Sequence, residues 1–225
     1  MIPLRDENRS SSTPVVTYLL ILLCAAVFLY TLSLGSEARI ERFFFAYGAT
    51  PSKVTGQAGG EPLAAYPTLI TSMFLHGGWA HLIGNMLYLW IFGDNVEDAM
   101  GRVGFLLFYL MTGIAAVLTH TFLHPGSTVP LVGASGAIAG VLGGYLVLYP
   151  GARILSLVPL GFFIRVVAVP AYFFLPVWFV MQFIFGLAEL AATATTVAWW
   201  AHVGGFVAGV VLVRLFARRR ASSRW

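Results

Sequence analysis

The feature that most constrains the fold of this chain is a series of apolar stretches, several of them long enough to cross a lipid bilayer. The first of them, Val15–Leu34, has about the 20 residues that a membrane-spanning helix needs. Charged residues make up only 10% of the chain, whereas a soluble domain of this size carries about a quarter. The sequence therefore predicts an integral, multi-pass membrane protein.

Six such stretches predict an all-α fold, a six-transmembrane-helix bundle that forms a single domain over residues 1–225. The second and the fourth stretch are short for a full span. A short helix can lie inside a ring of longer ones, begin below the membrane surface and leave a water-filled space above it. The fourth would be a short central helix that carries a serine. The stretches are Val15–Leu34, Trp79–Phe92, Val103–Thr121, Ser135–Tyr149, Val169–Leu187 and Ala198–Phe216.

The basic residues predict the orientation of these spans. With both termini in the cytosol, 10 of the 13 basic residues fall on the cytosolic side, as expected from the positive-inside rule. The chain would then have a cytosolic N-terminal tail (1–14), a first outer loop (35–71) and a basic cytosolic tail (217–225). We interpret the basic tail as a stop signal for the last helix, with contact to anionic lipid as the alternative. In the outer loop, Ile40–Pro51 is aromatic-rich and amphipathic, which suits the membrane interface.

Several classes of protein are disfavoured by what the sequence lacks. A single cysteine, Cys24, excludes an intramolecular disulfide framework and a thiolate metal cluster. The net charge of +4 gathers at the ends and in short loops, which does not suit a nucleic-acid partner. No H-E-x-x-H motif occurs, and His120 and His124 have no acid or thiol nearby. Hydrogen bonding at the interface explains these two histidines better than a metal site does, so we expect no metal.

Polar residues at membrane depth are costly and therefore mark candidate functional positions. His81 and Asn85 lie four residues apart, share one helix face and can both donate hydrogen bonds while uncharged. A polar pair that holds two helices together explains these two residues equally well when they are taken alone. The polar residues at the outward ends of the spans are His76, His81, Asn85, Ser135, Gln182 and His202.

Ser135 and His202 fall at similar depth, each near the outward start of its apolar stretch. Glycines lie near both residues, and a G-x-x-x-G pattern follows the histidine. Because glycine has no side chain, the two helices could approach each other closely. A serine and a histidine within hydrogen-bond reach are the minimum for an activated hydroxyl nucleophile. The glycines are Gly133, Gly136, Gly205 and Gly209.

The acidic residues favour a dyad over a triad. No acid falls within an apolar stretch, and only Glu189 and acids of the first outer loop share the outer side with Ser135. Negative charge that develops on the carbonyl oxygen of a substrate would need hydrogen-bond donors to stabilise it. His81, Asn85 and the backbone N–H of Ser135 are the candidates for these donors. The sequence G-A-S-G-A around the serine lacks the last glycine of G-x-S-x-G, so an α/β-hydrolase elbow is not favoured.

Three motifs in this order resemble the rhomboid intramembrane serine proteases: HLIGN at His81–Asn85, GASG at Gly133–Gly136 and AHVGGFVAG at Ala201–Gly209. The resemblance implies Ser135 as nucleophile and His202 as general base. It also implies an oxyanion hole, a loop shaped by glycine before the serine and a supporting outer-loop histidine. These residues are His81, Asn85 and the amide of Ser135 for the oxyanion hole, with Gly133 for the loop and His76 for support.

The same resemblance implies a serine endopeptidase that needs no cofactor and cuts membrane-anchored, single-span proteins near the outer face. Its partners would be transmembrane protein substrates and membrane lipid, and its location a prokaryotic plasma membrane. The fifth helix, which contains Pro176, would form a gate together with the loop 188–197. The oligomeric state stays open.

Two departures from the family pattern affect these expectations. Tyr66 and Pro67 stand where many members carry a Trp-Arg pair, so lipid contacts of the first outer loop would differ. Ala139 stands where some members carry a tyrosine stacked on the histidine, so Trp199 or an aromatic residue of the fifth span, such as Phe183, would have to position His202. An inactive relative would lack the serine or the histidine, and a transporter or lipid-handling protein would carry charges at mid-membrane. Both alternatives are therefore less favoured.

Overall fold

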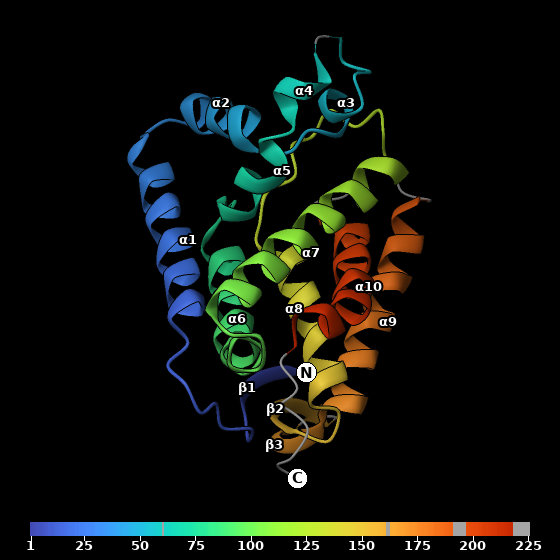
Figure 1. The fold of residues 1–225 in the computed structure, drawn as a ribbon. Coiled ribbons are helices and arrows are strands. Elements are labelled where there is room, and N and C mark those ends of the chain that lie inside the picture. Colours follow the sequence, from blue (N-terminus) through green and yellow to red (C-terminus); the bar gives the residue numbers. More distant parts are fainter. Residues whose placement is uncertain (60, 161–162, 191–196, 218–225) are drawn as a thin grey trace.

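A computed structural model of the chain describes residues 1–59, 61–160, 163–190 and 197–217. Most of these residues form helices, and the longer ones run between two ends of the molecule (Figure 1). The longer helices are α1 (Val15–Ser33), α6 (Trp79–Met100), α7 (Arg102–Leu123), α8 (Ser135–Leu148), α9 (Ala171–Leu190) and α10 (Trp199–Phe216). Among the described residues, α1, α7, α9 and α10 are long and apolar enough to cross a membrane, and α8 is a shorter apolar helix. The chain is therefore an integral membrane protein, while the number of six spans stays a prediction.

Helix α8 lies at the centre of the bundle and packs against α6, α7, α9 and α10. It has 14 residues, and every one from Gly136 to Tyr145 is buried. Its first turns consist largely of glycine and alanine, so neighbouring helices approach its backbone rather than long side chains. The residue at which this helix begins is Ser135, which therefore lies inside the bundle.

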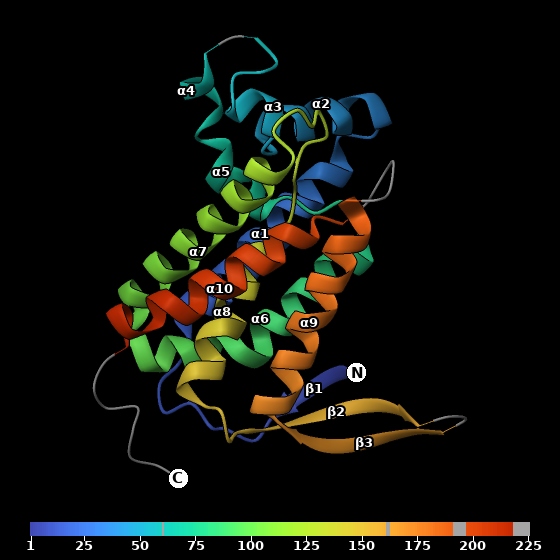
Figure 2. The same ribbon diagram turned by 90° about the vertical axis from the view of Figure 1, so that its right-hand side faces the viewer.

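The prediction of an all-α fold is wrong at one end of the molecule, where three strands form an antiparallel sheet in the order β1-β2-β3. The segment before α9 is rich in valine and isoleucine, whose branched side chains favour strands, and it pairs as a hairpin. Residues 2–6 of the predicted N-terminal tail form the third strand of this sheet. Figure 2 shows the hairpin extending to the side beneath α9. The strands are β1 (Ile2–Asp6), β2 (Arg153–Leu160) and β3 (Phe163–Pro170).

Helix α6 is also longer than predicted, because it continues for two turns beyond the apolar stretch that ends at Phe92. Glu97 in this extension is buried, and its carboxylate accepts hydrogen bonds at 2.8–2.9 Å from the backbone N–H groups of Val16 and Thr17. The Thr17 hydroxyl donates to the same carboxylate at 2.8 Å. Glu97 thus satisfies donors in the first turn of α1 that have no partner within that helix. The polar end of α6 is helical because another helix supplies its hydrogen-bond partners.

Asp6 fixes β1 to the helices. Its Oδ2 accepts hydrogen bonds from the Tyr145 hydroxyl at 2.6 Å and from Asn95 Nδ2 at 2.9 Å. Burial raises the pKa of Asp6 from 3.8 to about 7, an effect that the Tyr145 hydrogen bond opposes and the nearby Asp94 reinforces. Between pH 4 and pH 7 the docked strand therefore binds more protons than a released one. Docking of the strand therefore becomes less favourable as the pH rises through this window, and it is least favourable above pH 7.

We therefore expect a spin label on Leu4→Cys, an exposed position, to be more mobile at pH 8 than at pH 5.5 in electron paramagnetic resonance spectra. Cys24 is buried and should not react with the label. In an Asp6→Asn background the pH dependence should disappear, because the side chain at position 6 no longer titrates. Equal mobility at both pH values, or a dependence that survives in Asp6→Asn, would contradict this role of Asp6.

The predicted first outer loop, 35–71, lies at the end opposite the sheet and is largely helical (Figure 1). The aromatic-rich stretch of this loop forms α2, none of whose residues is fully buried, as an interfacial helix would require. The loop 124–134 passes beside it, and the backbones of Ala49 and Leu131 pair in a short bridge. The elements of this end are α2 (Glu37–Tyr47), α3 (Pro51–Val54), α4 (Pro62–Ala65), α5 (Thr68–Thr71) and η1 (Ser72–Phe74). The basic residues 218–225 and most of the expected gate loop, 191–196, lie outside the described residues.

Candidate functional site

Ser135 begins α8 at the end of the loop 124–134, and the local backbone explains its accessible position. Gly133 adopts φ +128°, which other residues rarely adopt, and its N–H donates to the carbonyl of Ser72 at 2.9 Å. A Cβ at Gly133 would lie 2.6 Å from His81 Nε2. Glycine at this position therefore allows the chain to turn into α8 while the His81 ring lies directly against the backbone.

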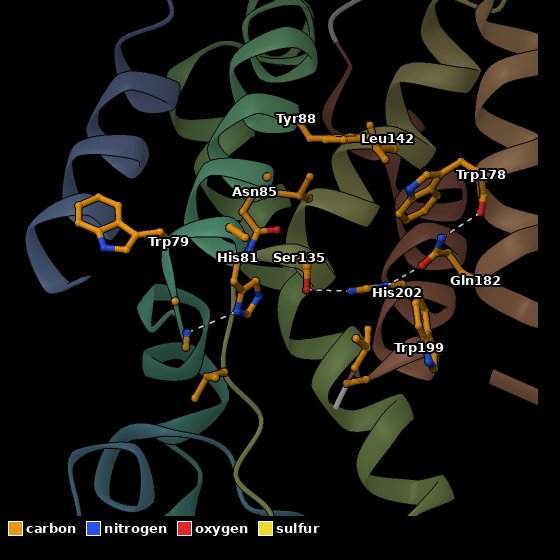
Figure 3. A pocket seen from close by; sticks show the side chains of 18 residues that line it. Trp79, His81, Asn85, Tyr88, Ser135, Leu142, Trp178, Gln182, Trp199 and His202 are labelled. Carbon is orange, nitrogen blue, oxygen red and sulfur yellow. Dashed lines mark hydrogen bonds between the residues drawn. The ribbon is translucent and has the colours of Figure 1, made fainter. Parts of the chain in front are cut away.

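The structure brings Ser135 and His202 together, although 67 residues separate them in the chain. Ser135 Oγ lies 2.8 Å from His202 Nε2, at hydrogen-bonding distance. The other ring nitrogen, Nδ1, lies 2.9 Å from Oε1 of Gln182 on α9. Figure 3 shows the three side chains in a row between α8, α10 and α9.

Two tryptophans border the His202 ring. Trp178 lies at a centroid distance of 6.0 Å with planes tilted by 35°, and Trp199 lies at 6.0 Å nearly perpendicular to the ring. Phe183, the other aromatic residue considered from the sequence, packs edge-on against Trp200 at 5.7 Å instead. Trp178 is thus the aromatic residue of the fifth span that borders His202. The contact of Gln182 with His202 is one that the sequence did not indicate. The available signal was the presence of Gln182 among the polar residues at membrane depth.

The close approach of α8 and α10 depends on glycine in both helices. A Cβ built on Gly205 would overlap the carbonyl oxygen of Gly136, and one on Gly209 would overlap that of Gly140. A Cβ on Gly136 would lie only 2.6 Å from the Cβ of Ala116 on α7. These backbone contacts set the separation of the two helices that carry Ser135 and His202.

His81 and Asn85 lie on the first turns of α6 and face the same hollow as Ser135 (Figure 3). The N–H of Gly77 donates to His81 Nδ1 at 3.4 Å, so the neutral ring carries its proton on Nε2, the atom beside Gly133. Asn85 is buried, and its Nδ2 donates to none of the described residues. The N–H of Ser135 lies in the first turn of α8, where a helix supplies no acceptor. All three residues line one cavity, and each carries a hydrogen-bond donor.

His76 lies behind His81 rather than in this hollow. It is 1% exposed and contacts the His81 ring edge-on at 5.1 Å. Neither ring nitrogen of His76 has a hydrogen-bond partner among the described residues. Its place in the structure is that of a packing partner for His81.

The hollow is a cavity of about 870 Å³ whose lining includes Ser135, His202, His81 and Asn85. Aromatic side chains provide much of the remaining wall (Figure 3). A few convergent polar groups in an apolar wall are typical of a ligand or active site. The aromatic residues are Trp79, Tyr88, Trp178 and Trp199.

The other candidate residues lie away from the cavity. His120 and His124 stack on each other at 4.5 Å near the end of α7. No group of three His, Cys, Asp or Glu residues suited to a metal ion occurs in the described parts of the chain. Glu189 is buried on α9 and is not part of the cavity lining. The acids of the extended end of α6, Glu97 among them, lie toward the sheet.

Comparison with known proteins gives a consistent set of relatives. The family model of the Rhomboid domain matches residues 64–219. The chain is 32% identical to Rhomboid-like protein 11, chloroplastic, of Arabidopsis thaliana over 168 residues, which is 71% of this chain and 55% of that protein. It is 37% identical to Rhomboid protease GluP of Bacillus subtilis over 133 residues, or 59% of this chain and 24% of that protein. Rhomboid protein 1, mitochondrial, of Saccharomyces cerevisiae is 37% identical over 95 residues, covering 40% of this chain and 28% of that protein.

The chain thus spans about half the length of the first of these relatives and less of the others. The relatives come from a bacterium, a chloroplast and a mitochondrion. They agree with an integral membrane protein but do not select a prokaryotic plasma membrane, which stays a prediction from the sequence.

Proposed function

The chain belongs to the rhomboid family, and from this membership we propose that it is an intramembrane serine endopeptidase. The observation that carries the proposal is the contact of 2.8 Å between Ser135 Oγ and His202 Nε2 at the wall of a cavity. A serine hydroxyl is a weak nucleophile until an adjacent base accepts its proton, and this geometry supplies that base. One of the relatives, GluP, is named a rhomboid protease, which supports the same reaction.

The reaction would proceed in two halves. Ser135 Oγ attacks the scissile carbonyl while its proton passes to His202 Nε2. Collapse of the tetrahedral intermediate breaks the C–N bond, and His202 returns the proton to the leaving amine, so that an ester to Ser135 remains. Water then adds to the ester with His202 again as base, which releases the acid and restores the serine.

Negative charge on the carbonyl oxygen would be stabilised by donors that are already in place. His81 Nε2–H, Asn85 Nδ2–H and the N–H of Ser135 belong to residues that line the same cavity as the hydroxyl. Donors that are fixed before the reaction stabilise charge at no cost of reorganisation. Asn85 Nδ2 has no hydrogen-bond partner in the part of the chain that the structure describes, which supports this role because a buried amide without a partner is otherwise costly.

The proposed substrates are single-span membrane proteins, cut near the outer face. The first turns of α6, α8 and α10 line the cavity, and these helices begin on the side of the molecule away from the sheet (Figures 1 and 2). If the sheet lies in the cytosol, as the positive-inside rule predicts, this side is the outer one. A helical segment must unwind before it can enter, because its peptide carbonyls are otherwise bonded within the helix.

A fluorophosphonate probe tests the proposal directly, since it labels a hydroxyl only when a neighbouring base activates it. The purified parent protein in detergent should be labelled, whereas Ser135→Ala and His202→Ala should not. Ser156→Ala, which changes a buried serine of β2, is the matched control and should be labelled like the parent. Labelling of Ser135→Ala at the parent rate would overturn the assignment.

Asn85→Ala tests the oxyanion hole. Removal of one donor should lower kcat for a model single-span substrate by about 10²–10³-fold and leave KM nearly unchanged, because the hydrogen bond forms mainly in the transition state. Fluorescence-based cleavage assays over a range of substrate concentrations in the bilayer would separate the two constants. A normal kcat would mean that Asn85 only links helices.

A further inference from the structure

Gln182 connects His202 to the backbone of α9. The residue is 6% exposed, and its side chain contacts a hydrogen-bonding group at each end. Oε1 lies 2.9 Å from His202 Nδ1, and Nε2 donates to the carbonyl oxygen of Trp178 at 3.2 Å. Resting on the proposed function, we propose that Gln182 is a positioning residue that fixes the tautomer and orientation of His202 for proton transfer from Ser135.

The hydrogen-bonding capacities of the groups determine the direction of every bond in this row. A backbone carbonyl oxygen can only accept, so the amide group of Gln182 must present Nε2 to Trp178. Oε1 then faces His202, and because it can only accept, His202 Nδ1 must carry the ring proton. His202 Nε2 is left with its lone pair toward Ser135 Oγ, 2.8 Å away (Figure 3). This is the tautomer that a general base for Ser135 requires.

The Trp178 carbonyl, with which this series of hydrogen bonds begins, is held rigidly. The Trp178 carbonyl belongs to the interior of α9, so it keeps its direction as long as the helix is intact. A reversed amide would bring two oxygens together at Trp178 and two donors together at a His202 that retained its tautomer. The Trp178 ring, tilted by 35° at 6.0 Å, and the perpendicular ring of Trp199 border the imidazole on other sides. The tryptophans thus limit the ring plane, and Gln182 decides which nitrogen is protonated.

An uncharged amide suits this location better than the carboxylate that orients histidine in many serine hydrolases. Among the described residues that line the cavity there is no Asp or Glu. An ionised group at membrane depth carries a large desolvation cost, which the amide avoids. The amide oxygen still directs its partial negative charge at Nδ1–H, which favours the imidazolium that forms when Ser135 reacts.

The tautomer of His202 can be measured without reference to activity. Nitrogen-15 NMR of the full protein with labelled histidine, in micelles above the titration range of histidine, separates Nδ1–H from Nε2–H rings. The His202 signals are assigned by their absence in His202→Ala. We expect His202 in the parent to be the Nδ1–H form, and we expect Gln182→Met, which has similar length and no acceptor, to populate the Nε2–H form. An Nε2–H ring in the parent, or an unchanged tautomer in Gln182→Met, would overturn the proposal.

Kinetics give the second readout. In Gln182→Met, kcat should fall by about 10–10³-fold with little change in KM, since loss of the correct tautomer affects proton transfer and not binding. Gln182→Glu keeps an acceptor opposite Nδ1 and should recover kcat to within about 10-fold of the parent if orientation is the role of the side chain. Met181→Leu, on the half-exposed side of the same helix, is the control and should behave like the parent.

The two measurements separate the two hypotheses. If the parent protein cleaves no substrate and takes no fluorophosphonate, the proposed function fails, while the NMR result still tests the tautomer. If the parent cleaves and Gln182→Met cleaves equally fast with the same tautomer, the dyad stands and the positioning role of Gln182 is wrong.

Discussion

Replacing Ser135 by alanine should reduce cleavage of a purified single-span substrate by about 10⁵–10⁶-fold. The alanine variant has no oxygen at the position 2.8 Å from His202 Nε2, so no acyl-enzyme can form. His202→Ala should have nearly the same effect, because the hydroxyl then has no base to accept its proton. Gel-based detection of the cleaved substrate in proteoliposomes measures both variants against the parent.

The double variant provides a sharper version of the same result. If the two side chains act as one unit, Ser135→Ala combined with His202→Ala should be no slower than either single variant. If the rate of the double variant falls by the product of the two single-variant losses, the groups act separately and their contact is structural. Ser156→Ala should cleave at the parent rate, since this buried serine belongs to the sheet at the far end. Cleavage by Ser135→Ala at the parent rate would leave the proposed endopeptidase without its nucleophile.

Gly205→Val should damage both stability and activity. Its first side-chain carbon would overlap the carbonyl oxygen of Gly136, so α8 and α10 must separate. Overpacking of this kind costs about 3 kcal/mol, which corresponds to a decrease in Tm of roughly 6–12 °C for a chain of this size. A displacement of about 1 Å between the serine and the histidine would itself reduce the rate by about 10²-fold.

A matched substitution on α10 separates this effect from a general sensitivity of the helix. Val211→Leu adds bulk on the same helix at a side chain that is 66% exposed, so it should leave Tm and cleavage nearly unchanged. Thermal unfolding followed by light scattering or by an environment-sensitive dye gives Tm for both variants. Normal stability and normal cleavage in Gly205→Val would show that the two helices do not meet at this glycine.

Much of the membrane-embedded part was predictable because its determinants are local. Apolar stretches of sufficient length located α1, α7, α8, α9 and α10 to within a few residues. The three quoted motifs identified the rhomboid family, which the family model over residues 64–219 confirms. Sequence reasoning failed where partners came from distant parts of the chain. It ended the second helix too early, because it could not know that the first turn of α1 binds Glu97.

The surroundings of His202 show the same limit at the site. Ala139 indicated that some other side chain must border the histidine, and the aromatic residues nearby in the sequence were the obvious candidates. Trp199 does border the ring, but Phe183 packs on Trp200, and Trp178 and Gln182 fill the remaining sides. Gln182 and Trp178 are separated by one helical turn, so only the rotation of α9 about its axis decides that both face His202.

The sequence by itself determined that this chain is a membrane protein, where its apolar helices lie and which serine and histidine resemble a dyad. Composition, stretch length and motif order are properties of the chain that need no contacts between distant residues. The tertiary structure alone decided which faces of the helices meet, how the sheet joins the N-terminus to the hairpin before α9, and which group contacts His202 Nδ1. The physical reason is that α8, α9 and α10 are apolar on nearly all sides, so their periodicity does not show which side faces a neighbour.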